Sequence, residues 1–218
     1  MSKRPSSEFS WHNLFRGSVR ESLAATNCVA RIGIQETRAW EGPLRYVVDD
    51  NQGNVGVVEF RSDGAVGAIS AHTPVRQFDG VRAVAVAPAR WQVALEQICR
   101  LPLLSEGAAV SALFWTAGEF IQALAPESWV NAGVELFRRE LLADSVWEED
   151  ARAYYDLAPD VARLAIAIAA RAVVQVPIVA LSESELRLLI PKGAEHEEQA
   201  LDLLTSDGLF EMSPAAVG

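Results

Sequence analysis

The chain has 218 residues, of which half are hydrophobic and 22% are charged, and its formal net charge is −10. This is the composition of a folded globular protein long enough to bury a substantial core, and it argues against disorder over most of the length. Residues 1–88 hold ten Lys or Arg and nine Asp or Glu, whereas residues 89–218 hold nine and twenty. The negative surplus of the second half disfavours nucleic acid and anionic membranes, and it favours a basic protein partner.

Targeting and redox features point to a cytoplasmic protein. No apolar run follows Lys3 and Arg4, so we expect no secretory signal. The stretch 164–181 is apolar, but Arg171 lies in its interior, which favours a buried core helix over a membrane span. Cys28 and Cys99 have no paired spacing and are expected to be small buried hydrophobes.

The first half is predicted to be rich in strands. Ser10 is placed to cap a helix that runs to about Ala25. Apolar alternation then predicts strands at 28–37, 44–48, 55–60, 65–70 and 81–87. Asp63 and Gly64 lie between two of these runs and are a strong hairpin signal, and the short connections favour an antiparallel meander.

The second half is predicted to be helical from Ala89 onward. Apolar residues at helical spacing predict helices ending near Pro102, from Ser105 to about Leu124, and across 130–141. Ser145 and Glu148 match a capping box, and Pro159 suits the first turn of a helix to about Val176. Two shorter helices are expected to begin at Ser184 and Ala194.

These elements together predict the α+β class. Residues 1–88 would form an N-terminal helix and a mostly antiparallel β-meander, and residues 89–218 an acidic α-helical bundle. The two halves would be either one compact domain or two.

No motif for nucleophilic catalysis or nucleotide binding is present. The chain lacks Gly-x-Ser-x-Gly, Ser-x-x-Lys and Walker patterns, and Cys99 lies in an apolar stretch typical of an inert thiol. We therefore assign no catalytic residue and no cofactor. His72 follows a predicted strand, where it could meet Glu59 or Asp79 at the sheet edge. That arrangement is an alternative hypothesis for a small-ligand or hydrolase-like site.

Two acidic segments resemble metal-binding motifs, but each lacks residues that its motif requires. His196 is flanked by Glu195 and Glu197, but position 200, where the zinc-protease pattern needs a second His, is Ala. The segment beginning at Asp49 resembles a calcium loop, yet its sixth position is Asn54 and its twelfth is Phe60. We predict no metal site.

A candidate partner-binding patch lies near the start of the helix expected after residue 143. Carboxylates surround an aromatic side chain there, which suits an interface anchor with charges that steer the encounter. The predicted residues are Asp144, Trp147, Glu148, Glu149, Asp150 and Tyr154. The alternative interpretation is a solvated helix start whose Trp147 faces the core, because acidic residues stabilise a first turn by themselves.

The leading hypothesis is a non-enzymatic protein-binding protein. In size, charge and lack of catalytic groups the chain is similar to bacterial immunity proteins, which neutralise toxins, although no motif carries this likeness. Such a protein would meet a basic toxin or nuclease with its acidic half. A further alternative is a structural subunit whose apolar stretch 164–176 forms an oligomer interface.

Overall fold

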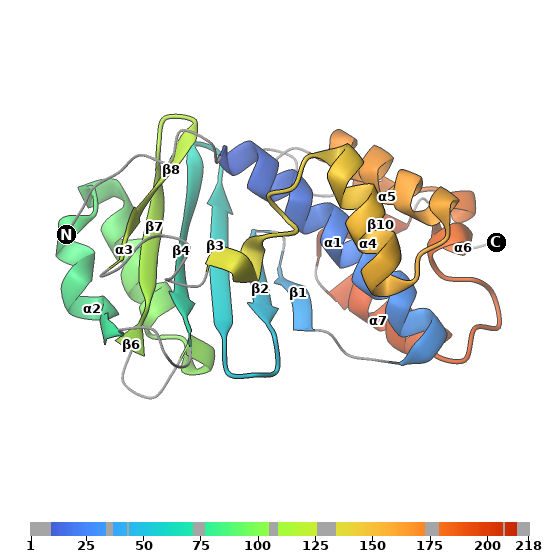
Figure 1. Cartoon of the computed structure of the whole chain (residues 1–218), viewed down its shortest axis with the longest axis horizontal. Coiled ribbons are helices and arrows are strands. Elements are labelled where there is room, and N and C mark those ends of the chain that lie inside the picture. The colour runs from blue at the N-terminus through green and yellow to red at the C-terminus, as the bar shows by residue number, and fades with distance from the viewer. Residues whose placement is uncertain are drawn as a thin grey trace. The chain divides into compact units, whose positions relative to one another are not determined.

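The structure belongs to the α+β class predicted from the sequence: a long N-terminal helix is followed by a mostly antiparallel sheet and then by helices (Figure 1). It is a computed structural model. Residues 10–33, 37–42, 44–71, 77–104, 109–125, 134–172, 179–206 and 208–212 are described. His72 and the chain termini lie outside these ranges.

The chain forms two compact units, each assembled from two separate stretches. Unit 1 comprises Met1–Leu14 and Arg45–Arg138, and unit 2 comprises Phe15–Leu44 and Arg139–Gly218. Their net charges are −2 and −8, so most of the negative surplus belongs to unit 2. The halves 1–88 and 89–218 follow a different division and stay a prediction.

The main sheet has the strand order β1-β2-β3-β4-β7-β8. Pairing from β2 through β8 is antiparallel, and the pair Arg61 and Gly64 closes the hairpin predicted at Asp63 and Gly64. The strands expected at 44–48, 55–60 and 65–70 are confirmed. The bounds are β1 Thr37–Glu41, β2 Arg45–Asp49, β3 Val55–Arg61, β4 Gly64–Ser70, β7 Ala112–Ala117 and β8 Phe120–Leu124.

The core of unit 1 lies between this sheet and helix α3 (Ala89–Cys99), which packs on β4 (Figure 1). Trp91, Leu95 and Ile98 of α3 are buried, as their helical spacing predicted. The Trp91 indole N–H donates a hydrogen bond to the Thr116 carbonyl oxygen at 3.1 Å. The short elements are β5 Phe78–Asp79, η2 Pro102–Leu104, β6 Ala109–Val110 and η3 Val134–Phe137, and β5 pairs with β6.

The strand predicted at 81–87 is wrong, because this segment forms α2 (Gly80–Ala83) and the 3-10 helix η1 (Val84–Val86). The Asp79 side chain accepts a hydrogen bond from the Arg82 backbone N–H and so caps α2. Side-chain capping stabilises a helical turn regardless of the apolar alternation that follows.

The helix predicted from Ser105 to about Leu124 is also wrong, since the described part forms β6, β7 and β8. β7 pairs with β4 on one side and β8 on the other, and all but its last residue is buried. A strand buried on both faces has a continuous apolar run, which fits helical spacing by chance. Of the helix expected across 130–141, the described residues contain only the short η3, and Val130 lies outside them.

Unit 2 contains strand β1, a small parallel pair of strands, and helices around the buried part of α1 (Trp11–Ile32). Every residue of α1 from Gly17 to Ala30 is buried. The predicted strand at 28–37 is therefore wrong in its first part, because a helix buried all round shows no amphipathic stripe. The other elements are α4 Asp144–Tyr155, α5 Pro159–Arg171, β9 Val179–Leu181, α6 Glu183–Leu189, α7 Glu197–Ser206 and β10 Phe210–Met212.

The later helices match their predictions closely. Pro159 is at the first turn of α5, and Ser182, two residues before the expected Ser184, caps α6 in a capping box with Glu185. α7 begins three residues after the expected Ala194. None of the helices in the described ranges is long and apolar enough to cross a membrane.

Replacing Gly67 by Ala should strongly destabilise unit 1. An added Cβ would lie 2.1 Å from the Phe114 ring and 2.3 Å from the Val57 carbonyl oxygen, so strands must shift. We expect a loss of about 3 kcal/mol in the free energy of unfolding, measured by urea denaturation. Gly118→Ala is the control, because its φ of 69° is strained but the space around it is open, and it should cost about 1 kcal/mol. Equal losses would contradict the packing account.

Candidate interaction surface

All six predicted partner-binding residues lie on α4 of unit 2. The helix begins after Ala143, and no side chain caps this end, so the expected capping box of Ser145 and Glu148 is wrong. Asp144 instead occupies the first turn, where the helix dipole favours a carboxylate.

The inner face of α4 is formed by Trp147, Ala151 and Tyr155, which are spaced four residues apart and are buried. Trp147 is 0% exposed, and its indole N–H donates a hydrogen bond to Glu21 Oε1. Trp147 therefore faces the core, as the alternative interpretation of this helix start expected. A partner therefore cannot reach the Trp147 ring unless unit 2 opens.

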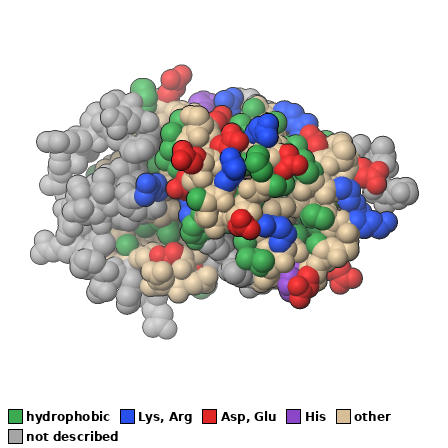
Figure 2. Space-filling model, turned by 45° about the vertical axis from the view of Figure 1, so that its right-hand side comes forward, with side chains coloured by type: hydrophobic (Ala, Val, Ile, Leu, Met, Phe, Trp, Pro, Cys, Tyr) green, Lys and Arg blue, Asp and Glu red, His purple; other side chains and the backbone are tan. Residues whose placement is uncertain are grey.

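The outer face of α4 combines apolar and acidic side chains. Val146 is 53% and Tyr154 52% exposed, Glu149 and Ala153 are exposed, and Asp150 is half-buried. We call Val146, Glu149, Asp150, Ala153 and Tyr154 the α4 surface. On the coloured part of the face in Figure 2, acidic, basic and hydrophobic side chains are interspersed.

Arg139 holds part of the α4 surface in place. Its Nε donates to Asp150 Oδ2 at 2.9 Å, and its guanidinium carbon lies 3.1 Å from the centre of the Tyr154 ring. Tyr155 meets the same Tyr154 ring edge-on, with the ring centres 4.9 Å apart. A half-exposed aromatic ring fixed from two sides loses little conformational entropy when a partner binds it.

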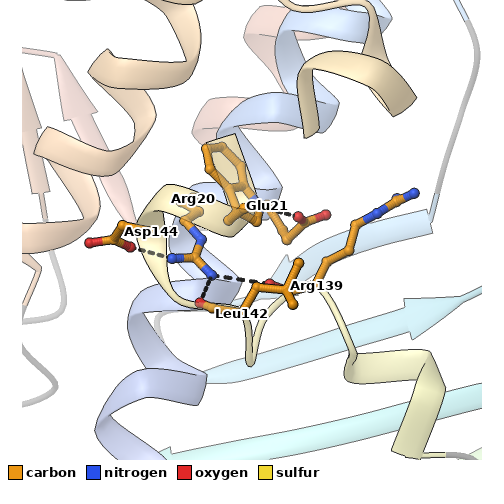
Figure 3. Close-up of polar contacts among 6 residues, drawn as sticks. Arg20, Glu21, Arg139, Leu142 and Asp144 are labelled. Atoms are coloured by element: carbon orange, nitrogen blue, oxygen red, sulfur yellow. Dashed lines mark hydrogen bonds and ion pairs between the residues drawn. The ribbon is translucent and has the colours of Figure 1, made fainter. Parts of the chain in front are cut away.

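Arg20 of α1 anchors the turn that leads into α4 (Figure 3). Its Nη2 donates to the carbonyl oxygens of Arg139 at 3.0 Å and Leu142 at 2.6 Å, and its Nη1 pairs with the Asp144 carboxylate. Burial lowers the pKa of Arg20, and the carboxylates of Asp144 and Glu21 act against this shift. A buried guanidinium needs such partners, because removing it from water is costly.

Gly17 permits this turn to approach α1 closely. A Cβ at position 17 would lie 1.8 Å from the Glu140 carbonyl oxygen. No residue other than glycine fits there unless the backbone moves.

Sequence reasoning missed Arg20, Glu21, Arg139 and Val146 as parts of this arrangement. The apolar spacing identified one stripe of this helix, which includes Val19 and Leu23, and it assigned no role to Arg20 and Glu21. The opposite side of α1 also carries small or apolar residues, namely Gly17, Ala24 and Cys28. Apolar residues on both sides were the available signal that the helix is buried all round and that its charges need partners.

The alternative site at the sheet edge depends on His72, which lies outside the described residues, so that hypothesis stays a prediction. Of its other two residues, Glu59 pairs with Arg61 at 2.7 Å, and Asp79 caps α2. Both cysteines are buried thiols, as predicted. Burial, with the nearby carboxylates of Asp79 and Glu96, raises the pKa of Cys99 to about 11.

The two acidic segments have local structural roles. Glu197 accepts a hydrogen bond from the Gly193 backbone N–H, and this contact with the ion pair to Arg187 lowers the pKa of Glu197. Burial opposes but does not prevent a lowered pKa at Asp50, which accepts hydrogen bonds from Asn54 and Gln52 within the turn. Among the residues that the structure describes, no three His, Cys, Asp or Glu are placed to hold a metal ion.

Arg20→Lys should destabilise unit 2 although it keeps the charge. A single ammonium group cannot reproduce the fork that reaches two carbonyl oxygens and Asp144. We expect a loss of about 2 kcal/mol by urea denaturation. Arg152→Lys, on an exposed position of α4, should change the value by less than about 0.5 kcal/mol. A similar effect of both variants would contradict the anchoring role of Arg20.

Cys99 should resist alkylation in the folded protein. A pKa raised from 9.0 to about 11 leaves about 100-fold less thiolate at pH 8, and burial blocks access to it. Mass spectrometry after iodoacetamide treatment should find Cys99 unmodified without urea and fully modified in urea. Rapid modification of the folded protein would show that this thiol is reactive after all.

Comparison with known proteins identifies no relative. No family model, curated protein or solved structure matches the chain. The interaction surface therefore has to be interpreted from its own side chains.

Proposed function

We propose that the protein is a non-enzymatic protein-binding protein that contacts a basic partner through the α4 surface. The observation that carries this proposal is the half-exposed Tyr154 ring, which is held in place by Arg139 and shares α4 with the exposed Glu149 and Val146. Rigid aromatic side chains ringed by polar groups are characteristic binding anchors.

Apolar area is available at both ends of the α4 surface. Val146 and Tyr154 are eight residues apart, about 12 Å along the helix. A partner that buries both side chains also comes within reach of Glu149 and Asp150 between them. This combination favours a partner surface with Lys or Arg side chains flanked by apolar groups.

Electrostatics supports the same partner class. Unit 2 has a net charge of −8, which attracts a basic protein over distances of about 10 Å at moderate salt. A basic toxin or nuclease neutralised by an immunity-type inhibitor is the proposed form of this interaction. The active cleft of such a toxin or nuclease would have a positive electrostatic potential, which the acidic side chains of the α4 surface complement.

The oligomeric-subunit alternative would have to use the outward side of α5. Within the described part of 164–176, the buried side of α5 includes Ala165, Ile168 and Ala169. Contacts of α5 with α4 and α6 occupy that side within unit 2.

The test is affinity capture from the native host with two charge-matched variants. The α4 variant is Glu149→Lys, and the control is Glu198→Lys on α7, both at exposed positions. We expect the wild type and the α7 control to retain the same basic protein, and the α4 variant to bind it at least about tenfold more weakly.

Salt provides a second readout on the captured protein. Its affinity for the wild type should fall as NaCl rises from about 0.05 M to about 0.5 M. Capture of no basic protein, or equal loss of binding by both variants, would overturn the proposal, as would an affinity independent of salt.

A further inference from the structure

We infer that Glu21 of α1 is the positioning residue of the α4 surface: its buried carboxylate fixes the rotation of α4 about the helix axis. The functional consequence of this rotation rests on the proposed function, because the α4 surface has a role only if a partner binds it. The positioning itself is a property of unit 2 and can be measured without a partner.

One carboxylate holds both ends of the inner face of α4. Glu21 is 0% exposed, and it accepts hydrogen bonds from the Trp147 indole N–H at Oε1 and from the Tyr155 hydroxyl at Oε2, the latter at 2.8 Å. These donors belong to residues eight positions apart. Two directional contacts separated along a helix define its rotation and its axial position, whereas apolar packing alone is non-directional.

The adjacent Arg20 reinforces the same placement. Its guanidinium carbon lies 4.9 Å from the centre of the Trp147 ring, and the same group anchors the turn before α4 (Figure 3). Neighbouring residues of α1 thus hold the beginning of α4 and its inner face. The buried carboxylate also lies close enough to Arg20 to interact with it electrostatically.

The outer face follows from this placement. Successive helical residues are about 100° apart, so a one-residue change of rotation would turn the exposed Val146 inward, into the place of Trp147. Such a change would also move Tyr154 away from Arg139, which fixes its ring. Glu21 therefore acts on the surface through Trp147 and Tyr155, without contacting a partner itself.

The test is Glu21→Gln in the full-length protein, observed by NMR. The indole N–H of Trp147, assigned by its loss in Trp147→Phe, should shift upfield because a neutral amide is a weaker acceptor than a carboxylate. Backbone amides of α4 should exchange with solvent at least about tenfold faster, while amides of α6 and α7 keep their rates. The control is Glu185→Gln, which removes the capping carboxylate of α6 and should accelerate exchange in α6 instead.

A second pair of variants covers the case in which Glu21→Gln does not fold. Tyr155→Phe removes one donor to Glu21, and Tyr154→Phe makes the same chemical change on the half-exposed neighbouring ring. We expect faster exchange in α4 only for Tyr155→Phe. Equal α4 exchange in these two variants would overturn the inference, as would an unchanged Trp147 indole signal in a folded Glu21→Gln protein or a uniform acceleration across unit 2.

These outcomes separate the two proposals. Exchange and indole signals report on α4 whether or not a basic partner exists. Failure to capture a partner would contradict the proposed function but not the positioning role of Glu21. A Glu21→Gln substitution without effect on α4 would contradict the positioning role but not the capture of a partner.

Discussion

Two consecutive charged residues, Arg20 and Glu21, are buried on α1, and the organisation of unit 2 depends on how they are satisfied. Arg20 is 3% exposed and Glu21 is 0% exposed. A charge in such a position is tolerated only when hydrogen-bond partners replace its water. The hydrogen-bond partners named above lie within 139–155, far away in sequence, so these contacts bring α1 and α4 together.

This requirement also explains why the inner and outer faces of α4 differ in character. The inner face contributes donors, an indole and a hydroxyl, where an all-apolar helix would have sufficed for burial. Directional contacts select one arrangement from several that pack equally well. Arg139 links these inner contacts to the outer face of α4. Its carbonyl oxygen accepts a hydrogen bond from Arg20, and its side chain stacks on Tyr154 and pairs with Asp150.

The sequence predicted the elements whose local signals agree with their tertiary surroundings. Asp63 and Gly64 specify a hairpin by turn geometry, and Trp91, Leu95 and Ile98 give a one-sided helix, so both were found. β7 and the end of α1 were missed for one shared reason. Residues 112–116 of β7 and 17–30 of α1 are all buried, and periodicity carries information only when one face meets water. For the candidate surface, the sequence located α4 and its carboxylates. The roles of Arg20 and Glu21 could not be predicted, because they depend on contacts between residues more than a hundred apart in sequence. The role of Arg139 depends on contacts between a turn and a helix.

The net negative charge of unit 2 therefore does not by itself indicate which residues would contact a partner. Several carboxylates of unit 2 are engaged within the unit: Glu21 by Trp147, Asp144 by Arg20, Asp150 by Arg139, Glu185 by Arg171 and Glu197 by Arg187. Their charge still contributes to the long-range field, but their oxygens already have partners. Steering by net charge and recognition by contact then belong to different residues. Under the proposed function, the contacts that distinguish one basic partner from another should come from Tyr154, Val146 and Glu149, because net charge alone attracts basic proteins without distinguishing among them.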